Sequence, residues 1–284
     1  MSRRPHLLRL AAAGVAVAAL ALSGCASSGT PSATESGSDE GWITSGKITI
    51  ATGEPAYYPW VIDDDPASGE GFEAAVAYAV AEQLGFDADD VVWVRTTFDE
   101  AIAPGPKDFD VNLQQFSITD ERKESVDFSS PYYETTQVVV TTAASPAADA
   151  TSIADLKDLL IGAQTGTTSY TTIESVIQPT QGAQAFNSND DAKLALENGQ
   201  VDAIVVDLPT AFYISGVELT DGVLVGQLPT PDGETGDQFG LVLPKDSPLT
   251  EQVTAAVDAL REDGTLDELA SEWLGGEGQA PLLK

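Results

Sequence analysis

The 284-residue chain has one cysteine, one histidine and one methionine, and its 45 aspartates and glutamates far outnumber its 13 lysines and arginines. The formal net charge is −32, and no basic cluster exists with which the chain could contact nucleic-acid phosphates. Hydrophobic residues make up 42% and charged residues only 20%, which is enough apolar material for sizeable cores. We therefore expect about two folded domains and no binding of nucleic acid.

The N-terminus has the three regions of a secretory signal peptide. Basic residues stand at Arg3, Arg4 and Arg9, an Ala/Leu/Val-rich stretch runs from Leu10 to Leu22, and small residues follow. The apolar stretch is shorter than the roughly 20 residues of a membrane span. Leu22-Ser23-Gly24-Cys25 resembles the lipobox of bacterial lipoproteins, which implies a signal peptide over 1–24 and lipidation at Cys25. An ordinary signal peptide with a chance cysteine is the alternative.

Cleavage before Cys25 leaves 260 residues with 10 basic and 45 acidic side chains, a net charge of −35. His6 and Met1 leave with the signal peptide, so the mature chain has no histidine. This excludes Ser-His-Asp triads, Cys-His nucleophiles, zinc fingers, histidine-liganded metals and internal disulfides. We expect no metal and no cofactor. The acidic loops at 63–65 and 232–237 lack EF-hand spacing and are expected to be solvated.

Residues 25–46 are rich in Ser, Gly and Thr and predict a flexible linker behind the lipid anchor. Strand-like and helix-like patterns then alternate. Ile48 and Ile50 indicate a strand, Phe72 to Leu84 a helix and Val91 to Val94 a second strand. The alternation starts again near residue 155, and Thr265 to Glu268 suggests a capping box for a last helix. The pattern favours an α/β protein with mostly parallel sheets covered by helices.

Two extended segments, 137–142 and 238–243, stand where the chain could cross between two such units. We expect residues 47–136 with 238–284 to form lobe 1 and residues 137–237 to form lobe 2. Two crossings place a ligand cleft between the lobes and a hinge behind it.

Two neighbouring runs carry a family resemblance. Residues 116–122 read Phe-Ser-Ile-Thr-Asp-Glu-Arg, and residues 126–133 read Val-Asp-Phe-Ser-Ser-Pro-Tyr-Tyr. They resemble the signature of the family 3 extracellular solute-binding proteins, the amino-acid receptors of ABC importers. Further landmarks follow in family order between Lys47 and Leu274, namely Tyr57-Tyr58-Pro59-Trp60, Gly71-Phe72-Glu73, Gly166-Thr167-Thr168, the strand ending at Asp207, Gly264-Thr265 and Trp273. The resemblance implies a two-lobe, periplasmic-binding-protein-like type II fold that closes on a free amino acid.

The resemblance also assigns roles in the site. It implies that Arg122 binds the ligand carboxylate together with Ser117 and the turn at Gly166 and Thr168, while Asp207 takes the ammonium. Simple physics agrees, because the charges of a zwitterion that leave water must be paired, and a guanidinium is a planar fork of donors. Taken alone, however, Arg122 would be read as a surface ion pair and Asp207 as a helix cap.

The side chain of the ligand is less constrained. The resemblance places Glu54, Gln114 and Gln115 near it, although these residues depart from the usual family types. Tyr57, Trp60 and Phe98 could stack on it or belong to the core. The two glutamines suggest a polar amino acid, and arginine, lysine, glutamine and asparagine remain open.

The hypothesis is a monomeric, lipid-anchored binding protein on the extracytoplasmic face of the cell membrane, which delivers a polar amino acid to an ABC permease. It is not expected to be an enzyme. The alternative is a cyclohexadienyl dehydratase on the same fold, in which Glu54 would act as the general acid.

Overall fold

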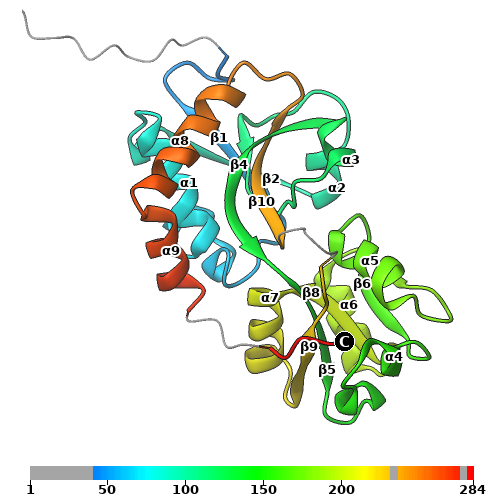
Figure 1. Ribbon diagram of the computed structural model, residues 1–284. Coiled ribbons are helices and arrows are strands. Elements are labelled where there is room, and N and C mark those ends of the chain that lie inside the picture. The colour runs from blue at the N-terminus through cyan, green and yellow to red at the C-terminus, as the bar shows by residue number, and fades with distance from the viewer. Residues whose placement is uncertain (1–40, 231–235, 276–279) are drawn as a thin grey trace, which may run out of the picture. The chain divides into compact units, whose positions relative to one another are not determined.

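The strand and helix patterns of the sequence become two separate five-stranded sheets (Figure 1). The computed structural model describes residues 41–230, 236–275 and 280–284, which belong to one unit beginning at Gly37. The predicted signal peptide, Cys25 and the linker up to residue 40 lie outside the described residues. No helix in the part of the chain that is described is long and apolar enough to span a membrane.

The first sheet has the order β2-β1-β3-β10-β4. Strand β1 is buried along its whole length and pairs in parallel with β2 on one side and β3 on the other. Strand β10 lies antiparallel between β3 and β4. The bounds are β1 Ile48–Gly53, β2 Val91–Thr96, β3 Val111–Asn112, β4 Val126–Thr135 and β10 Asp237–Pro244.

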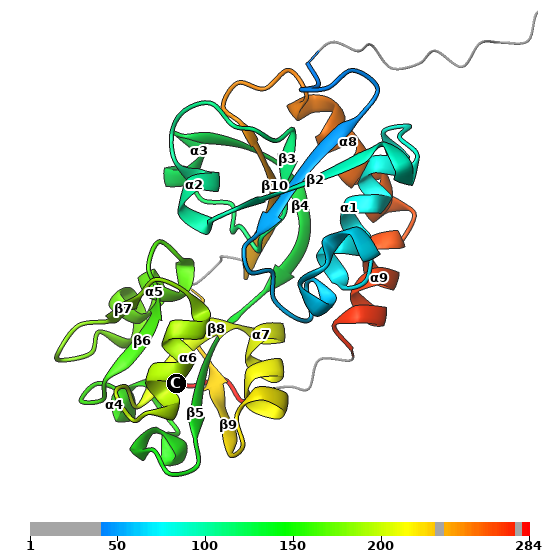
Figure 2. The same cartoon turned by 180° about the vertical axis from the view of Figure 1, so that it is seen from behind.

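Helices cover both faces of this sheet (Figure 2). Helices α1, α8 and α9 pack together on one face over Ile48, Ile50 and Leu241, whereas α2 and α3 lie on the other side. Gly71 precedes α1 at φ +102°, and a Cβ there would lie 2.6 Å from the carbonyl oxygen of Trp60. The bounds are α1 Phe72–Gln83, α2 Phe98–Ile102, α3 Asp120–Lys123, α8 Thr250–Glu262 and α9 Thr265–Trp273.

The second sheet has the order β7-β6-β8-β5-β9, in which β6 is parallel to β7 and β8 while β5 is antiparallel to β8 and β9. Alternate residues of β8 face opposite layers: Ile204 packs with α6 and α7, and Val205 packs with α4 and the α5 region. The bounds are β5 Gln137–Thr142, β6 Ile161–Gln164, β7 Gln184–Phe186, β8 Ala203–Asp207, β9 Gly222–Gln227, α4 Ile153–Leu156, α5 Thr168–Thr172, α6 Asn189–Glu197 and α7 Leu208–Tyr213. A π-helical turn extends α5 and another extends α7, at Ile173–Ile177 and Ile214–Glu218. The predicted α/β class is confirmed.

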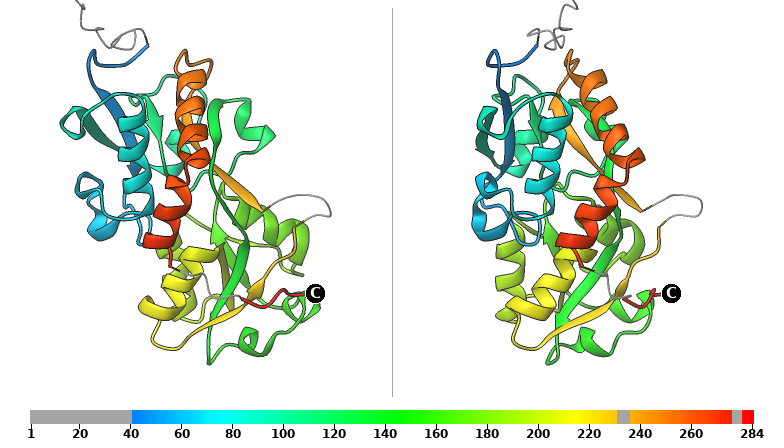
Figure 3. Two further views of the ribbon diagram at one scale, coloured as in Figure 1. Left: turned by 60° about the vertical axis from the view of Figure 1, so that its left-hand side comes forward. Right: turned by 90° about the vertical axis from the view of Figure 1, so that its left-hand side faces the viewer.

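The chain passes from the first sheet to the second between β4 and β5, and it returns between β9 and β10. The end of the chain departs from the predicted assignment of 238–284 to lobe 1. Leu282 pairs with Gln227 beside β9, and Ala280 and Leu283 are buried in the cores of the second sheet. Figure 3 shows the C-terminal end beside these strands, whereas α8 and α9 lie on the first sheet. Residues 280–284 therefore dock on the second sheet.

The start of α9 also differs from the prediction. Thr265 is the first helical residue rather than the N-cap, which is Gly264 at φ +90° without a side-chain cap bond. A capping box needs a hydroxyl at the N-cap, so Thr265 and Glu268 cannot form one. The backbone N–H of Thr265 donates instead to Asp263 Oδ1 at 2.9 Å.

Candidate functional site

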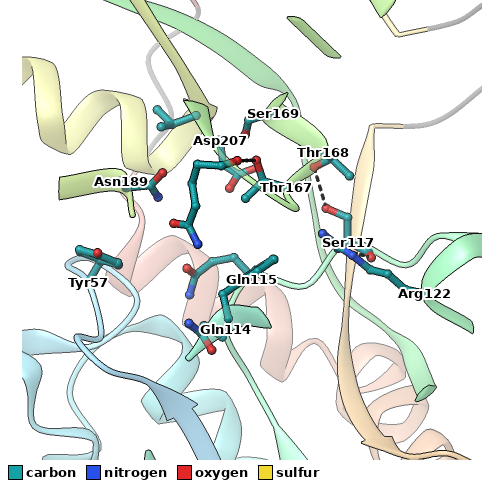
Figure 4. A pocket seen from close by; sticks show the side chains of 13 residues that line it. Tyr57, Gln114, Gln115, Ser117, Arg122, Thr167, Thr168, Ser169, Asn189 and Asp207 are labelled. Atoms are coloured by element: carbon teal, nitrogen blue, oxygen red, sulfur yellow. Dashed lines mark hydrogen bonds between the residues drawn. The ribbon is translucent and has the colours of Figure 1, made fainter. Parts of the chain in front are cut away.

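A pocket is lined by loops that follow the carboxyl ends of parallel strands in both sheets (Figure 4). Crevices at such strand ends are where ligands bind in open α/β sheets. The pocket brings together eight residues that the sequence predicted, namely Tyr57, Phe98, Gln114, Gln115, Ser117, Arg122, Thr168 and Asp207. It adds Thr167, which lies in the predicted Gly166-Thr167-Thr168 turn, and four residues that the sequence analysis missed, namely Gln164, Ser169, Asn189 and Val206.

The open space in the pocket is small, with a volume of about 30 Å³. Its lining is mostly polar, so the pocket offers hydrogen-bond partners rather than a large apolar cavity.

Arg122 is the cation of the site. It lies on α3, whose N-cap residue Thr119 accepts a hydrogen bond from the Arg122 backbone at 3.2 Å. The guanidinium donates to the carbonyl of Ser117 at 2.7 Å and to that of Gly166 at 2.9 Å, and it lies 5.3 Å from the ring centroid of Phe98. Burial lowers the pKa of Arg122, while nearby carboxylates raise it. An arginine in these surroundings remains charged, so the pocket holds a fixed positive group.

Asp207 is the acidic residue on the opposite side. It ends β8 at the N-cap position of α7, but its side chain makes no capping bond, so the helix-cap interpretation does not hold. Its Oδ1 accepts from Nε2 of Gln137 at 2.8 Å. Burial raises the pKa of Asp207 to about 8, helped by the negative charge of Asp237 and opposed by the Gln137 hydrogen bond and by Arg122.

The hydroxyl groups of Ser117 and Thr168 link the first sheet's loops to the start of α5. Ser117 Oγ lies 3.1 Å from Thr168 Oγ1, and Thr168 donates to Asp237 Oδ2 at 2.8 Å. Gln137 also donates to Asp237, at 2.6 Å. Asp237 was expected in a solvated acidic loop, but it begins β10 and is bound by partners that touch the pocket. The sequence placed Asp237 beside the predicted extended segment 238–243, but only the strand pairing shows that its side chain reaches Thr168.

Gln115 owes its conformation to a buried carboxylate. It has φ +52°, and its backbone N–H donates to Glu73 Oε1 at 2.7 Å while its side-chain amide donates to Oε2. Tyr132 donates its hydroxyl to the same carboxylate. Glu73 is 1% exposed, and burial raises its pKa to about 7. Next to Gln115, the carbonyl oxygen of the Gln114 side chain is buried and has no hydrogen-bond partner among the described residues.

Three predicted ligand contacts lie outside the pocket lining. Glu54 is exposed, and its backbone N–H donates to Thr96. Trp60 belongs to the core because it is fully buried against aromatic rings of the first sheet's core, and its Nε1 donates to Thr210 Oγ1 at 3.0 Å. Gly166 contributes its carbonyl to Arg122, as described above.

Further contacts join elements of the two sheets around the pocket. Tyr58 packs on Tyr213 with 4.3 Å between the ring centroids, and Trp60 bonds to Thr210 on α7. Tyr57 lies close to Asp190, and burial together with that charge raises its pKa to about 12. Within the described residues, no group of three or more His, Cys, Asp or Glu side chains is arranged to hold a metal ion.

Comparison with known proteins gives a consistent picture. The family described as bacterial extracellular solute-binding proteins, family 3, matches residues 48–276. The probable histidine-binding protein of Campylobacter jejuni is 30% identical over 231 residues, which cover 80% of this chain and 85% of that protein. A structure of an ancestral arginine-binding protein bound to glutamine has a TM-score of 0.67 at 29% identity and covers 82% of this chain and 100% of that one. The structure of the ancestral amino acid-binding protein AncCDT-1, a precursor of cyclohexadienyl dehydratase, has a TM-score of 0.64 at 28% identity. The match covers 81% of this chain and 95% of that one.

Proposed function

Because the chain belongs to family 3 of the bacterial extracellular solute-binding proteins, we propose that it binds a polar amino acid and delivers it to an ABC importer. The observation that carries this proposal is the pair Arg122 and Asp207, a guanidinium and a carboxyl group that line one pocket. Charges leave water only when partners of the opposite sign receive them. The pocket offers a cation for an α-carboxylate and an anion for an α-ammonium.

Arg122 uses two N–H groups on the carbonyls of Ser117 and Gly166, and a guanidinium has five. The remaining donors are available to a carboxylate. Asp207 accepts one hydrogen bond from Gln137 and keeps acceptor capacity for an ammonium. Arg122 lies on α3, which packs beside the first sheet, and Asp207 ends β8 of the second sheet. A ligand that bridges the two residues would therefore favour a closed arrangement over an open one.

The ligand's side chain would meet Gln114, Gln115, Tyr57 and Asn189. The unpartnered carbonyl oxygen of Gln114 is a buried acceptor, which costs free energy until a donor reaches it. An amide, imidazole, guanidinium or ammonium group supplies such a donor. The relatives include a histidine-binding protein and an ancestral arginine-binding protein, which agrees with a polar ligand of this kind.

The same proposal extends to the setting of the protein. The signal-peptide pattern over 1–24, Cys25 and the linker to residue 46 support secretion and a lipid anchor on the extracytoplasmic face, with a permease as the transport partner. Residues 47–136 with 238–275 would form one lobe, and residues 137–237 together with the docked end of the chain would form the other. The protein would act as a monomer.

The dehydratase alternative loses its proposed general acid, because Glu54 lies outside the pocket lining. AncCDT-1, to which the chain is similar, is itself an amino acid-binding protein. We therefore propose no second function.

Titration calorimetry with the twenty amino acids tests the proposal. We expect binding of at least one polar amino acid, and a loss of at least about 100-fold in affinity for Arg122→Ala, since hydrogen bonds to a charged group contribute about 1.5–3 kcal/mol each. Arg261→Ala is the matched control, because Arg261 is exposed and pairs with Asp258 outside the pocket. No binding of any amino acid, or undiminished affinity in Arg122→Ala, would contradict the proposed site.

A further inference from the structure

Two carboxylates share one amide group beside the pocket. Nε2 of Gln137 lies 2.8 Å from Oδ1 of Asp207 and 2.6 Å from Oδ2 of Asp237. The Gln137 carbonyl in turn accepts from Ser169 Oγ at 2.6 Å, which fixes which end of the amide faces the acids. Both N–H bonds of the amide are therefore used, one on each carboxylate.

The positions of the hydroxyl protons follow from this arrangement. An ionised carboxylate only accepts hydrogen bonds, so Thr168 spends its single hydroxyl proton on Asp237 at 2.8 Å. Ser117, 3.1 Å from Thr168 Oγ1, must then be the donor in their contact. Neither hydroxyl proton is left for a carboxylate placed beside Arg122.

We propose that Asp237 is a resident carboxylate, which competes with the ligand's own α-carboxylate for Thr168 and Arg122 and thereby sets the affinity of the site. This inference rests on the proposed function. A ligand carboxylate that accepts from Thr168 must first draw that hydroxyl away from Asp237. The ligand carboxylate must also interact with Arg122 while the negative charge of Asp237 is already close to that guanidinium.

The electrostatics of Arg122 support the competition. Burial lowers the pKa of Arg122, and among the charges that oppose this the one with the largest effect is Asp237, ahead of Asp207. Asp237 begins β10, whose pairing with β4 fixes its backbone opposite Thr135. Its carboxylate is thus held near the anion-binding side of the pocket by the sheet itself.

The two acids that share Gln137 therefore have opposite effects on binding. Asp207 receives the ammonium, and its neutralisation weakens binding. Asp237 opposes the carboxylate, so its neutralisation strengthens binding. An asparagine at 237 keeps the shape and still accepts from Thr168, but as a neutral and weaker acceptor.

Calorimetry with the best-binding amino acid tests this on the full mature chain. We expect the Kd to fall about tenfold in Asp237→Asn, which corresponds to about 1.4 kcal/mol, and to rise at least tenfold in Asp207→Asn. Asp221→Asn removes the same charge from an exposed side chain outside the pocket and should leave the Kd within about twofold. If Asp237→Asn does not fold, Asp237→Ser replaces it, because serine also removes the charge at position 237.

A double-mutant cycle with Thr168→Val separates hydroxyl competition from a general effect of charge. Because Asp237 engages the Thr168 proton, Thr168→Val alone should weaken binding less than about threefold. In the Asp237→Asn background the weaker acceptor lets the Thr168 hydroxyl turn to the ligand carboxylate, and the same change should weaken binding about tenfold. An unchanged or weaker affinity in Asp237→Asn, or equal effects of Thr168→Val in both backgrounds, overturns the inference. Absence of wild-type binding, or insensitivity to Arg122→Ala, instead overturns the proposed function.

Discussion

The carboxyl group of Asp207 holds its proton more tightly than a surface aspartate, because burial raises its pKa to about 8. At pH 6 the group is mostly neutral and cannot pair with an ammonium. Ligand binding must then expel a proton, and this cost disappears as the pH rises towards 8. The residue that would anchor the ammonium is thus also a proton-release site.

We expect the affinity for an amino acid to rise between pH 6 and 7.5, by up to about tenfold per pH unit. Calorimetry in buffers of different ionisation enthalpy should detect release of a proton on binding. Asp207→Asn should abolish both the release and the slope. An affinity that does not change with pH in the wild type would contradict the role given to Asp207.

Glu73 connects pH to stability. Burial raises its pKa to about 7, so the folded chain binds a proton that the unfolded chain gives up near pH 4.5. Its contribution to stability is therefore fully present below pH 4.5 and is lost as the pH rises to about 7. The loss is on the order of 3 kcal/mol for a shift of this size.

Urea unfolding of wild type and Glu73→Gln between pH 4.5 and 8 measures this contribution. We expect the wild type to lose stability relative to the glutamine variant as the pH rises through this range. Glu82→Gln, a change at an exposed position of α1, should run parallel to the wild type. A constant difference between wild type and Glu73→Gln would refute the raised pKa.

Sequence patterns identify pocket residues where chemistry and family motif coincide, as at Arg122, Thr168 and Asp207. They fail where burial decides the role. Trp60 has the type and place of a stacking residue, but its ring is enclosed by the core of the first sheet. Asp237 has the neighbours of a solvated loop, yet strand pairing brings it to Thr168. Both outcomes depend on contacts between residues more than 60 positions apart, which local patterns do not contain.

At the scale of elements, α7 and the loop after β1 form a buried contact between the two sheets. Trp60 is fully buried, Thr210 is 6% exposed, and the indole N–H donates to the threonine hydroxyl at 3.0 Å. If the two lobes move apart when the site opens, the Trp60 indole N–H loses Thr210 and donates to water instead. The bond therefore belongs to the closed arrangement. Loss of the acceptor would leave a buried donor unpaired, at a cost of about 1–3 kcal/mol.

Thr210→Val should therefore raise the Kd about fivefold or more and increase the radius of gyration of the ligand-bound protein measured by X-ray scattering. Thr210→Ser keeps the hydroxyl and should resemble the wild type in both measurements. Equal Kd values for the valine and serine variants would show that the contact does not stabilise closure.

The elements themselves follow the sequence to different degrees. Helix α1 and strands β1 and β2 agree with their apolar spacing, because each packs one consistent set of residues on the core. The start of α9 differs from the predicted one, because Gly264 with its positive φ is the N-cap and the helix therefore begins one position before the expected start. The capping box of Thr97 and Glu100 at the start of α2, the helix that begins with Phe98 of the pocket, has the same local signature and does form.

For the whole molecule, the docked end of the chain adds a connection between the two sheets beyond the crossings near Thr136 and before β10. Leu283 is 2% exposed against the core of the second sheet, and a Cβ on Gly226 would lie 2.8 Å from its Cγ. Neighbouring Leu282 is 57% exposed. Five residues carry no periodic pattern, so their docking could not be predicted from the sequence.

The two leucines provide a matched comparison. Leu283→Ala should lower the free energy of unfolding by about 2–4 kcal/mol, because a buried leucine leaves a cavity. Leu282→Ala should change it by less than about 0.5 kcal/mol. Chemical denaturation followed by circular dichroism measures both, and similar values for the two variants would argue against docking of this segment in solution.

The position of β10 in the first sheet has a consequence for the order in which the chain can fold. Strand β10 lies between β3 and β4, yet it is synthesised after every strand of the second sheet. Until it emerges, β4 has no strand partner in its own sheet. The second sheet, by contrast, has all five strands once residue 227 is made. During synthesis the second sheet can therefore be completed first, whereas the first sheet is complete only once β10 has been made as far as Pro244.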